Sequence, residues 1–177
     1  MTGTTNVEHH LPSGSDADDL LQRGVAPALR RARPDLSESL LDILAELLDN
    51  AMTHGDSPAG AELTVHADEG GVAASVTDHG IGIRAHLARA GIATDSDAQA
   101  IGVAAQEGTT GAYEPRGYGL SDSIRALAHL PESSLTIRSG TGIGVFGSPN
   151  APAFSEAEAT IPGTVATVTT GPRGQRR

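Results

Sequence analysis

The feature that most constrains the fold is the segment at residues 35–55, DLSESLLDILAELLDNAMTHG. Its apolar residues recur at intervals of three and four, which places them on one face of a helix: Leu40, Leu44, Leu47, Leu48 and Ala51. Asp35 and Glu38 have the spacing of a capping box at the start, and Gly55 is a suitable stop at the end. Such a helix must bury its leucine face, so we expect a second layer packed against it.

Two short segments after this helix predict that second layer. AELTVHA (61–67) and VAASVTD (72–78) alternate in apolar character and are separated by DEGG, which is the pattern of a β-hairpin. Asp78 has the same parity as Val72 and Val76, so its side chain is expected on the buried face of the strand. A carboxylate in that position needs a hydrogen-bond donor.

The other segments have weaker patterns. We expect a short strand at 7–11, a helix at 18–33 weakened by Pro27, one or two short helices within 83–115, a helix from Gly119, strands at 134–140, 142–147 and 160–170, and a loop at 149–159. Helices grouped with antiparallel strands indicate an α+β fold: a two-layer sandwich in which a mixed, mostly antiparallel sheet carries helices on one face.

Length and composition narrow the possibilities further. The 177 residues suggest one domain at 19–170, with a flexible segment at 1–18 and a flexible tail at 171–177. The net charge of -10 disfavours sequence-blind nucleic-acid binding. There is no cysteine, and all 12 basic residues are arginines, which excludes thiolate, Walker-A lysine and Schiff-base chemistry. No long apolar run predicts a signal peptide or membrane span, so we expect a cytoplasmic protein.

The polar face of the long helix is the first candidate for a site. Glu46, Asn50 and His54 are spaced by four and therefore share a face beside the leucines. A solvated surface is the ordinary interpretation of such residues. The alternative is a functional face, because an amide oxygen is a suitable Mg²⁺ ligand and a carboxylate can orient or deprotonate water.

The end of the second hairpin strand, DHGIGI (78–83), is the second candidate. Asp78 capping a turn is one interpretation. The other is a carboxylate at the floor of a pocket that accepts a hydrogen bond from an exocyclic amine. Gly80 and Gly82 would then let a flat ring approach the backbone.

The third candidate is RGYGL (116–120), which precedes a predicted helix. Glycine-rich turns at helix starts bind phosphates through free N–H groups, although a flexible loop explains one GxG equally well. Ala85 and Asp122 stand where a GxGxxG motif needs its third glycine, and the alternating βαβ pattern is missing. A dinucleotide-binding fold is therefore disfavoured.

The order of these motifs resembles the gyrase, heat-shock chaperone, histidine-kinase and mismatch-repair (GHKL) ATPase superfamily. The motifs are E-x-x-D-N-A-x-x-H on a helix, D-x-G-x-G-I at a strand end, G-x-G-L opening a helix and a late G-T on a strand, over roughly residues 36–170. The resemblance implies a Bergerat ATP-binding fold that binds ATP and Mg²⁺ between sheet and helices. It also implies a mobile lid over about residues 88–116.

The resemblance further implies roles for individual residues. Glu46 would position or deprotonate water, and Asn50 would be the Mg²⁺ ligand. Asp78 would hold the adenine amino group, with Thr164 assisting through water. The other implied contacts are Gly80, Gly82 and Ile83 beside the base, Gly117, Tyr118, Gly119 and Leu120 at the phosphates, and Thr109, Thr110 and Arg116 in the lid.

The resemblance also bears on the biological role. His9 and His10 lie in a polar segment rather than on a long heptad helix, so they are poor phosphoacceptors, and no transducer domain is evident. A stand-alone module is therefore expected. Such modules resemble anti-sigma regulatory kinases, which phosphorylate a serine of an antagonist protein, and free-standing histidine-kinase-like ATPase domains.

We therefore expect an ATP-dependent protein kinase or ATPase that phosphorylates or sequesters a protein partner. The partner would be a sigma factor, an antagonist or a response-regulator-like protein, and neither nucleic acid nor membrane is expected. A non-catalytic ATP-dependent switch is the alternative, and a structural domain with a decayed site is a third. The sequence leaves open whether the chain forms a homodimer.

Overall fold

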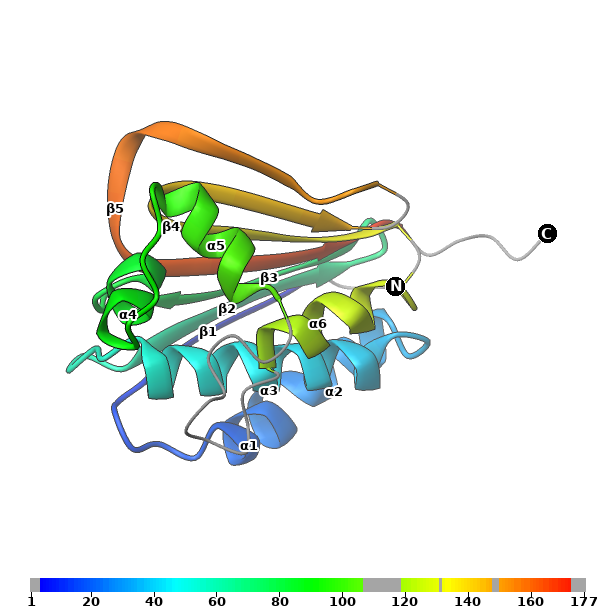
Figure 1. Ribbon diagram of the computed structural model, residues 1–177. Helices are drawn as coiled ribbons and strands as arrows, with labels where there is room; N and C mark the ends of the chain where they lie inside the picture. The colour runs from blue at the N-terminus through cyan, green and yellow to red at the C-terminus, as the bar shows by residue number, and fades with distance from the viewer. Residues whose placement is uncertain (1–3, 107–118, 131, 148–149, 173–177) are drawn as a thin grey trace.

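The computed structural model describes residues 4–106, 119–130, 132–147 and 150–172, and its main layer is an antiparallel sheet (Figure 1). The strands are β1 (Thr5–Leu11), β2 (Ala61–Asp68), β3 (Gly71–Asp78), β4 (Ser133–Gly147) and β5 (Ala153–Thr170). They lie in the order β1-β2-β3-β5-β4, and each described pairing is antiparallel. The expected strand at 7–11 is present, slightly longer, as β1 along the edge of β2.

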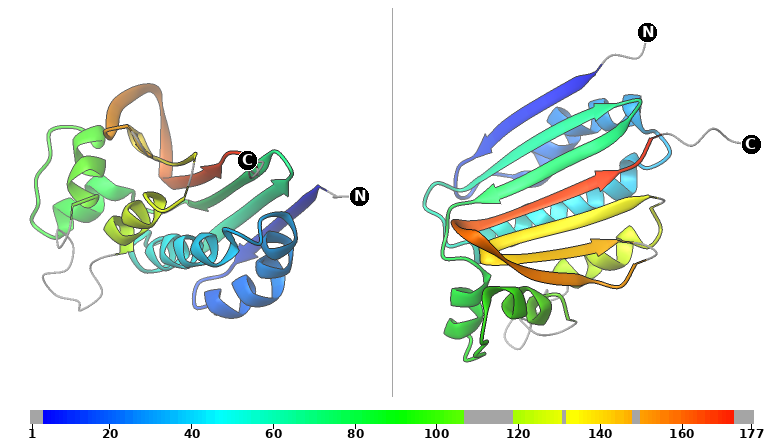
Figure 2. Two further views of the ribbon diagram at one scale, coloured as in Figure 1. Left: turned by 90° about the vertical axis from the view of Figure 1, so that its right-hand side faces the viewer. Right: turned by 90° about the horizontal axis from the view of Figure 1, so that it is seen from above.

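Helices cover one face of this sheet, which confirms the expected α+β sandwich (Figures 1 and 2). The helices are α1 (Ala17–Leu20), α2 (Ala26–Ala32), α3 (Ser37–His54), α4 (Ile83–Arg89), α5 (Asp97–Ala104) and α6 (Gly119–Leu127), with the π-helical turn η1 (Leu21–Val25) between α1 and α2. Among the described residues, no helix lies over the opposite face of the central strands (Figure 2). None of the helices within the described residues is long and apolar enough to cross a membrane.

Helix α3 is the centre of the helical layer, as its sequence predicted. All five leucine-face positions are buried and belong to the main hydrophobic core. The expected capping box is wrong, because the helix begins at Ser37 and its N-cap position has no side-chain hydrogen bond. Asp35 pairs instead with Arg33, and Glu38 pairs with Arg30, so ion pairs with the preceding segment replaced the expected cap.

The segment expected as one helix at 18–33 is divided into three parts. Pro27 lies in the first turn of α2, where its missing N–H costs no helical hydrogen bond. The π-helical turn before it absorbs the break and still buries Leu21 and Val25. The proline therefore changed the helical geometry without ending the helical segment.

The β2–β3 hairpin has the predicted alternation of buried residues. Leu63, Val65 and Ala67 alternate with exposed residues on β2, and Val72 and Val76 are buried on β3. Asp78 ends the buried row and is 3% exposed. The period-two pattern therefore placed this carboxylate on the correct face.

The β4–β5 region differs from the expectation. The segments at 134–140 and 142–147 both belong to β4, which bends at Gly140 (φ 61°), where the pairing register with β5 also shifts. A Cβ atom on Gly147 would lie 2.8 Å from the carbonyl oxygen of Ser133, so β4 folds back beside its own start (Figure 2). The loop expected at 149–159 is wrong, because β5 begins at Ala153 and pairs there with Val145.

Candidate functional site

A pocket lies between α3 and the sheet, at the end of the sheet where α4 and α6 also approach. It encloses about 890 Å³ of empty space, including its open mouth. The lining residues are Leu47, Asn50, Ala51, His54, Gly55, Val76, Asp78, Gly82, Ile83, His86, Leu87, Ala104, Leu120, Ser121, Ile137, Thr164 and Ala166. Most of these side chains are apolar, and the polar ones come from α3, β3, α4, α6 and β5, as is usual for small-molecule sites.

Asp78 is the buried charge of this pocket. Its Oδ1 atom accepts a hydrogen bond from the backbone N–H of Gly80 at 2.9 Å. Burial raises the pKa of the Asp78 carboxyl above its ordinary value, and hydrogen bonds from Gly80 and Thr164 only partly oppose this effect. A nearly dry carboxylate with a protein donor on one oxygen can accept a further hydrogen bond from a ligand.

Gly80 and Gly82, which follow Asp78, need to be glycine for different steric reasons. A Cβ atom on Gly80 would lie 1.5 Å from the carbonyl oxygen of Gly55, so Gly80 is needed for backbone packing against the end of α3. Gly80 is not among the lining residues, whereas Gly82 is. Gly82 has φ 77°, a conformation that favours glycine, and it caps the start of α4. The role of both glycines beside a base stays a prediction.

Gly163 is a site residue that the sequence interpretation did not single out. It has φ 61°, and a Cβ atom there would lie 2.6 Å from Asp78 Oδ1 and 2.2 Å from the Asp78 carbonyl oxygen. The signal was present in the PGT segment, where this glycine directly precedes Thr164. Its closeness to Asp78 follows from the strand pairing, which places Thr164 opposite Asp78.

The polar face of α3 reaches the pocket only in part. Asn50 and His54 line it, and the Asn50 Nδ2 atom is buried without a hydrogen-bond partner among the described residues. Glu46 lies one turn earlier on the exposed side of α3 and does not line the pocket. Desolvation raises the pKa of Glu46, and the nearby carboxylates of Asp49, Asp122 and Asp42 add to this shift.

Two histidines form part of the wall, and only one of them was anticipated. His54, from the end of α3, contacts His86 of α4 with ring centroids 4.8 Å apart and an interplanar angle of 59°. His86 had no motif to mark it, because it is one residue in a short helix of weak pattern. The pair adds flat, polarizable surface to the same pocket as Asp78.

The start of α6 forms another part of the pocket wall. Leu120 and Ser121 line it, and α6 begins at Gly119 as predicted. The segments expected around it are only partly described. Thr109, Thr110, Arg116, Gly117 and Tyr118 lie outside the described residues. Within residues 83–115, α4 and α5 confirm the one or two short helices predicted there.

Fold and site together are those of a protein that binds a small molecule between a sheet and its helices. An antiparallel sheet backed by helices holds an apolar pocket with one buried carboxylate at its floor and an amide-bearing helix along its side. That arrangement suits a flat heterocycle with an exocyclic amine and a polar, extended substituent.

Comparison with known proteins identifies the family. The protein-family model described as "Histidine kinase-, DNA gyrase B-, and HSP90-like ATPase" matches residues 35–169, and the chain belongs to this family. It is also 45% identical over 62 residues, 32% of its length, to the Sensor histidine kinase component HK1 of Mycobacterium tuberculosis strain H37Rv. The same values hold for the Probable sensor histidine kinase HK of Mycobacterium tuberculosis strain CDC 1551. The match covers 36% and 16% of those two relatives.

The residues present fit the nucleotide that this family implies. The apolar lining and the buried Asp78 carboxylate suit adenine, and the buried Asn50 Nδ2 atom, which has no hydrogen-bond partner among the described residues, is a donor for a polar group of the ligand. The described residues contain no group of three or more His, Asp or Glu residues able to hold a metal. Mg²⁺ does not need such a group, because protein sites commonly hold it through one or two side chains, substrate phosphates and water.

Proposed function

We propose that this chain binds Mg-ATP in the described pocket and uses it to act on a protein partner. The observation that carries the proposal is the buried Asp78 carboxylate at the floor of an apolar pocket whose side is lined by Asn50. Asp78 already accepts hydrogen bonds from Gly80 and Thr164. It would accept a further one from the adenine amino group. Asn50 would offer its amide oxygen to the Mg²⁺ that ATP carries.

Phosphoryl transfer to a partner side chain is the favoured activity. Glu46 lies one helical turn from Asn50 and has a raised pKa, which would suit a general base better than an ordinary carboxylate does. The partner would be a sigma-factor antagonist, a sigma factor or a response-regulator-like protein, with serine or histidine as acceptor. This assignment draws on the similarity to histidine kinases and on the resemblance to anti-sigma regulatory kinases.

A non-catalytic switch is the second candidate, and Glu46 is the observation that favours it. Its side chain is exposed and does not line the pocket, so ATP binding does not require it. In that case nucleotide would close the site, and the closed surface would bind the partner. Assembly as a homodimer is compatible with either candidate.

Calorimetric titration of Mg-ATP into wild type and Asp78→Asn tests the binding proposal. We expect binding by wild type and a loss of affinity of about 10- to 100-fold in the variant, the range for a hydrogen bond to a charged group. The absence of binding by wild type would refute the proposal.

Glu46→Ala and Asn50→Ala then separate the two activities. If the chain is a kinase, transfer of labelled γ-phosphate to a partner is lost in both variants, while Glu46→Ala retains ATP affinity. If it is a switch, Glu46→Ala keeps the ATP-dependent partner complex, and only Asn50→Ala loses it.

A further inference from the structure

Ser139 lies beneath the base-binding end of the pocket without lining it. It is on β4, is 3% exposed, and is directly paired with Thr164 of β5. Its Oγ atom accepts a hydrogen bond from the backbone N–H of Ile83 at 2.9 Å and donates one to the carbonyl oxygen of Gly163 at 3.0 Å. Ser139 Oγ also accepts a hydrogen bond from the Thr164 hydroxyl at 3.4 Å.

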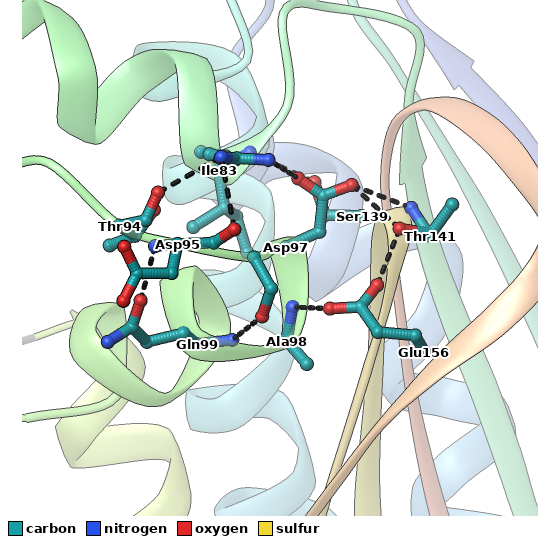
Figure 3. A network of polar contacts seen from close by, with 11 residues as sticks. Ile83, Thr94, Asp95, Asp97, Ala98, Gln99, Ser139, Thr141 and Glu156 are labelled. Carbon is teal, nitrogen blue, oxygen red and sulfur yellow. Dashed lines mark hydrogen bonds and ion pairs between the residues drawn. The ribbon is translucent and has the colours of Figure 1, made fainter.

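These partners belong to the segments that surround Asp78. Ile83 is the first residue of α4 and follows Gly82, a lining residue in the left-handed region. Gly163 also has a left-handed backbone conformation, and a Cβ atom there would lie 2.6 Å from Asp78 Oδ1. One hydroxyl thus connects the start of α4 and two neighbouring strands at the point where each approaches the buried carboxylate (Figure 3 labels Ser139 and Ile83).

The space around this hydroxyl is narrow. A Cβ atom on Gly82 would lie 2.9 Å from Ser139 Oγ and 3.4 Å from the carbonyl oxygen of Gly163. A serine hydroxyl supplies one donor and two acceptor sites, which suits a point where an N–H group and a carbonyl group converge. An alanine there leaves both of these backbone groups without their partner.

We propose that Ser139 is a positioning residue for nucleotide binding. It holds Gly82 and Gly163 at the spacing that leaves the base-binding end of the pocket open beside Asp78. The role rests on the proposed binding of ATP and goes beyond it, because Ser139 does not itself contact the nucleotide. Its effect is therefore confined to the end of the pocket that ATP, ADP and AMP share.

Ser133 provides a matched control. It is on the same strand, is 4% exposed, and its hydroxyl donates to the carbonyl oxygens of Leu130 and Leu127, at the end of β4 that pairs with Thr170. Ser133→Ala and Ser139→Ala therefore remove equally buried hydroxyls, but only Ser139 contacts the segments around Asp78. Both are expected to lower the melting temperature of the nucleotide-free protein.

The test is calorimetric titration of wild type and both variants with ATP, ADP and AMP. We expect Ser139→Ala to weaken all three by about the same factor, on the order of tenfold for the loss of these hydrogen bonds, and Ser133→Ala to retain wild-type affinity. Wild-type affinity in Ser139→Ala, or equal losses in both variants, would overturn the positioning role. No binding by wild type would instead overturn the proposed function, and this role with it.

A second variant covers the case in which Ser139→Ala does not fold. Ser139→Cys fills nearly the same space, and its thiol is a weak donor and acceptor. We expect a smaller but measurable loss, at least about threefold, for all three nucleotides. Wild-type affinity in this variant would also overturn the proposal.

Discussion

A carboxylate at the buried end of β3 is costly for this fold. Asp78 is 3% exposed, and burial raises its pKa despite hydrogen bonds from Gly80 and Thr164. An aspartate with a raised pKa is one whose ionised form the folded state tolerates poorly. The residue therefore trades stability for the ability to accept a hydrogen bond, which is a common arrangement at binding sites.

This gives a pH prediction with a defined sign. Because the pKa of Asp78 is raised above 3.8 in the fold, its contribution to stability is fully present below that value and is lost as the pH rises through the raised pKa. The free energy of unfolding of wild type minus that of Asp78→Asn should thus be larger near pH 4 than near pH 7. Urea denaturation at both pH values measures it, and an unchanged or opposite difference would contradict the assignment.

Gly163 provides a second prediction at the scale of one residue. Alanine at φ 61° is strained, and its Cβ atom would collide with Asp78, so we expect Gly163→Ala to cost about 2–4 kcal/mol of unfolding free energy. Gly14 has φ 84° with nothing within 4 Å of a Cβ atom, so Gly14→Ala should cost only about 1 kcal/mol. Denaturant unfolding of both variants separates collision from backbone strain, and equal costs would rule out the collision.

The sequence revealed some of these residues and not others for a physical reason. Asp78 was found because strand parity depends on neighbouring residues alone. Gly80 has no room for a side chain because the carbonyl group of Gly55 lies beside it. Ser139 forms hydrogen bonds with Ile83 and Gly163. All these partners are far away in the sequence. Such contacts exist only after the strands have paired, so no local pattern reports them.

At the scale of elements, α5 is attached to the bent part of the β4–β5 hairpin by a small polar network (Figure 3). Asp97 of α5 accepts hydrogen bonds from the backbone N–H of Thr141 at 2.9 Å and from its hydroxyl at 3.0 Å. Glu156 of β5 contacts the same hydroxyl and accepts from the N–H of Ala98 at 2.8 Å. Hydrogen bonds from Thr141 and Ala98 hold the pKa of Glu156 below its usual value, so the carboxylate stays ionised at neutral pH.

Thr141→Val should therefore loosen α5 without removing it. Valine has the same shape, but it has no hydroxyl for Asp97 and Glu156. We expect amide hydrogen exchange in Asp97–Ala104 to become about five- to tenfold faster, because the loss of one hydrogen bond raises the equilibrium constant for local opening by about that factor. Thr169→Val is the control, because that hydroxyl pairs with Ser134 on the open sheet face; faster exchange of α5 in the control would contradict the specific link.

The same region explains why one element was predicted wrongly. AFSEAEA at 153–159 contains no β-branched residue, and its glutamates and alanines are typical of loops or helices rather than strands. It is extended because it pairs with the end of β4 and because Glu156 and Phe154 contact α5. The α3 helix and the β2–β3 hairpin, by contrast, carry their pattern in adjacent residues and were predicted correctly.

At the scale of the molecule, a buried arginine joins the helical layer to the end of the sheet opposite the pocket. Arg33, between α2 and α3, donates from Nη1 to Thr170 Oγ1 at 3.2 Å and to the Gly171 carbonyl oxygen at 2.6 Å. Its guanidinium also pairs with Asp35. The side chain is 2% exposed, so it belongs to the folded interior rather than to the surface.

Arg33→Ala should lower the free energy of unfolding by about 2–3 kcal/mol, because the Thr170 hydroxyl and the Gly171 carbonyl lose hydrogen bonds from a buried charged group. It should leave ATP affinity unchanged, since Thr170 is at the far end of β5 from Thr164. Urea denaturation and calorimetric titration of the same variant measure the two effects. Weaker ATP binding by folded Arg33→Ala would mean that the two ends of the sheet are coupled.

Nucleotide binding itself should be visible in the stability of the whole chain. ATP that binds only the folded state stabilises it by about 2.7 kcal/mol at one hundred times the dissociation constant. For a chain of 177 residues, this raises the melting temperature by about 5–11 °C. Differential scanning fluorimetry with Mg-ATP measures the shift, and Asp78→Asn at the same ATP concentration should show much less of it. An equal shift in Asp78→Asn would place the ATP away from Asp78, because stabilisation follows affinity at whichever site the ligand occupies.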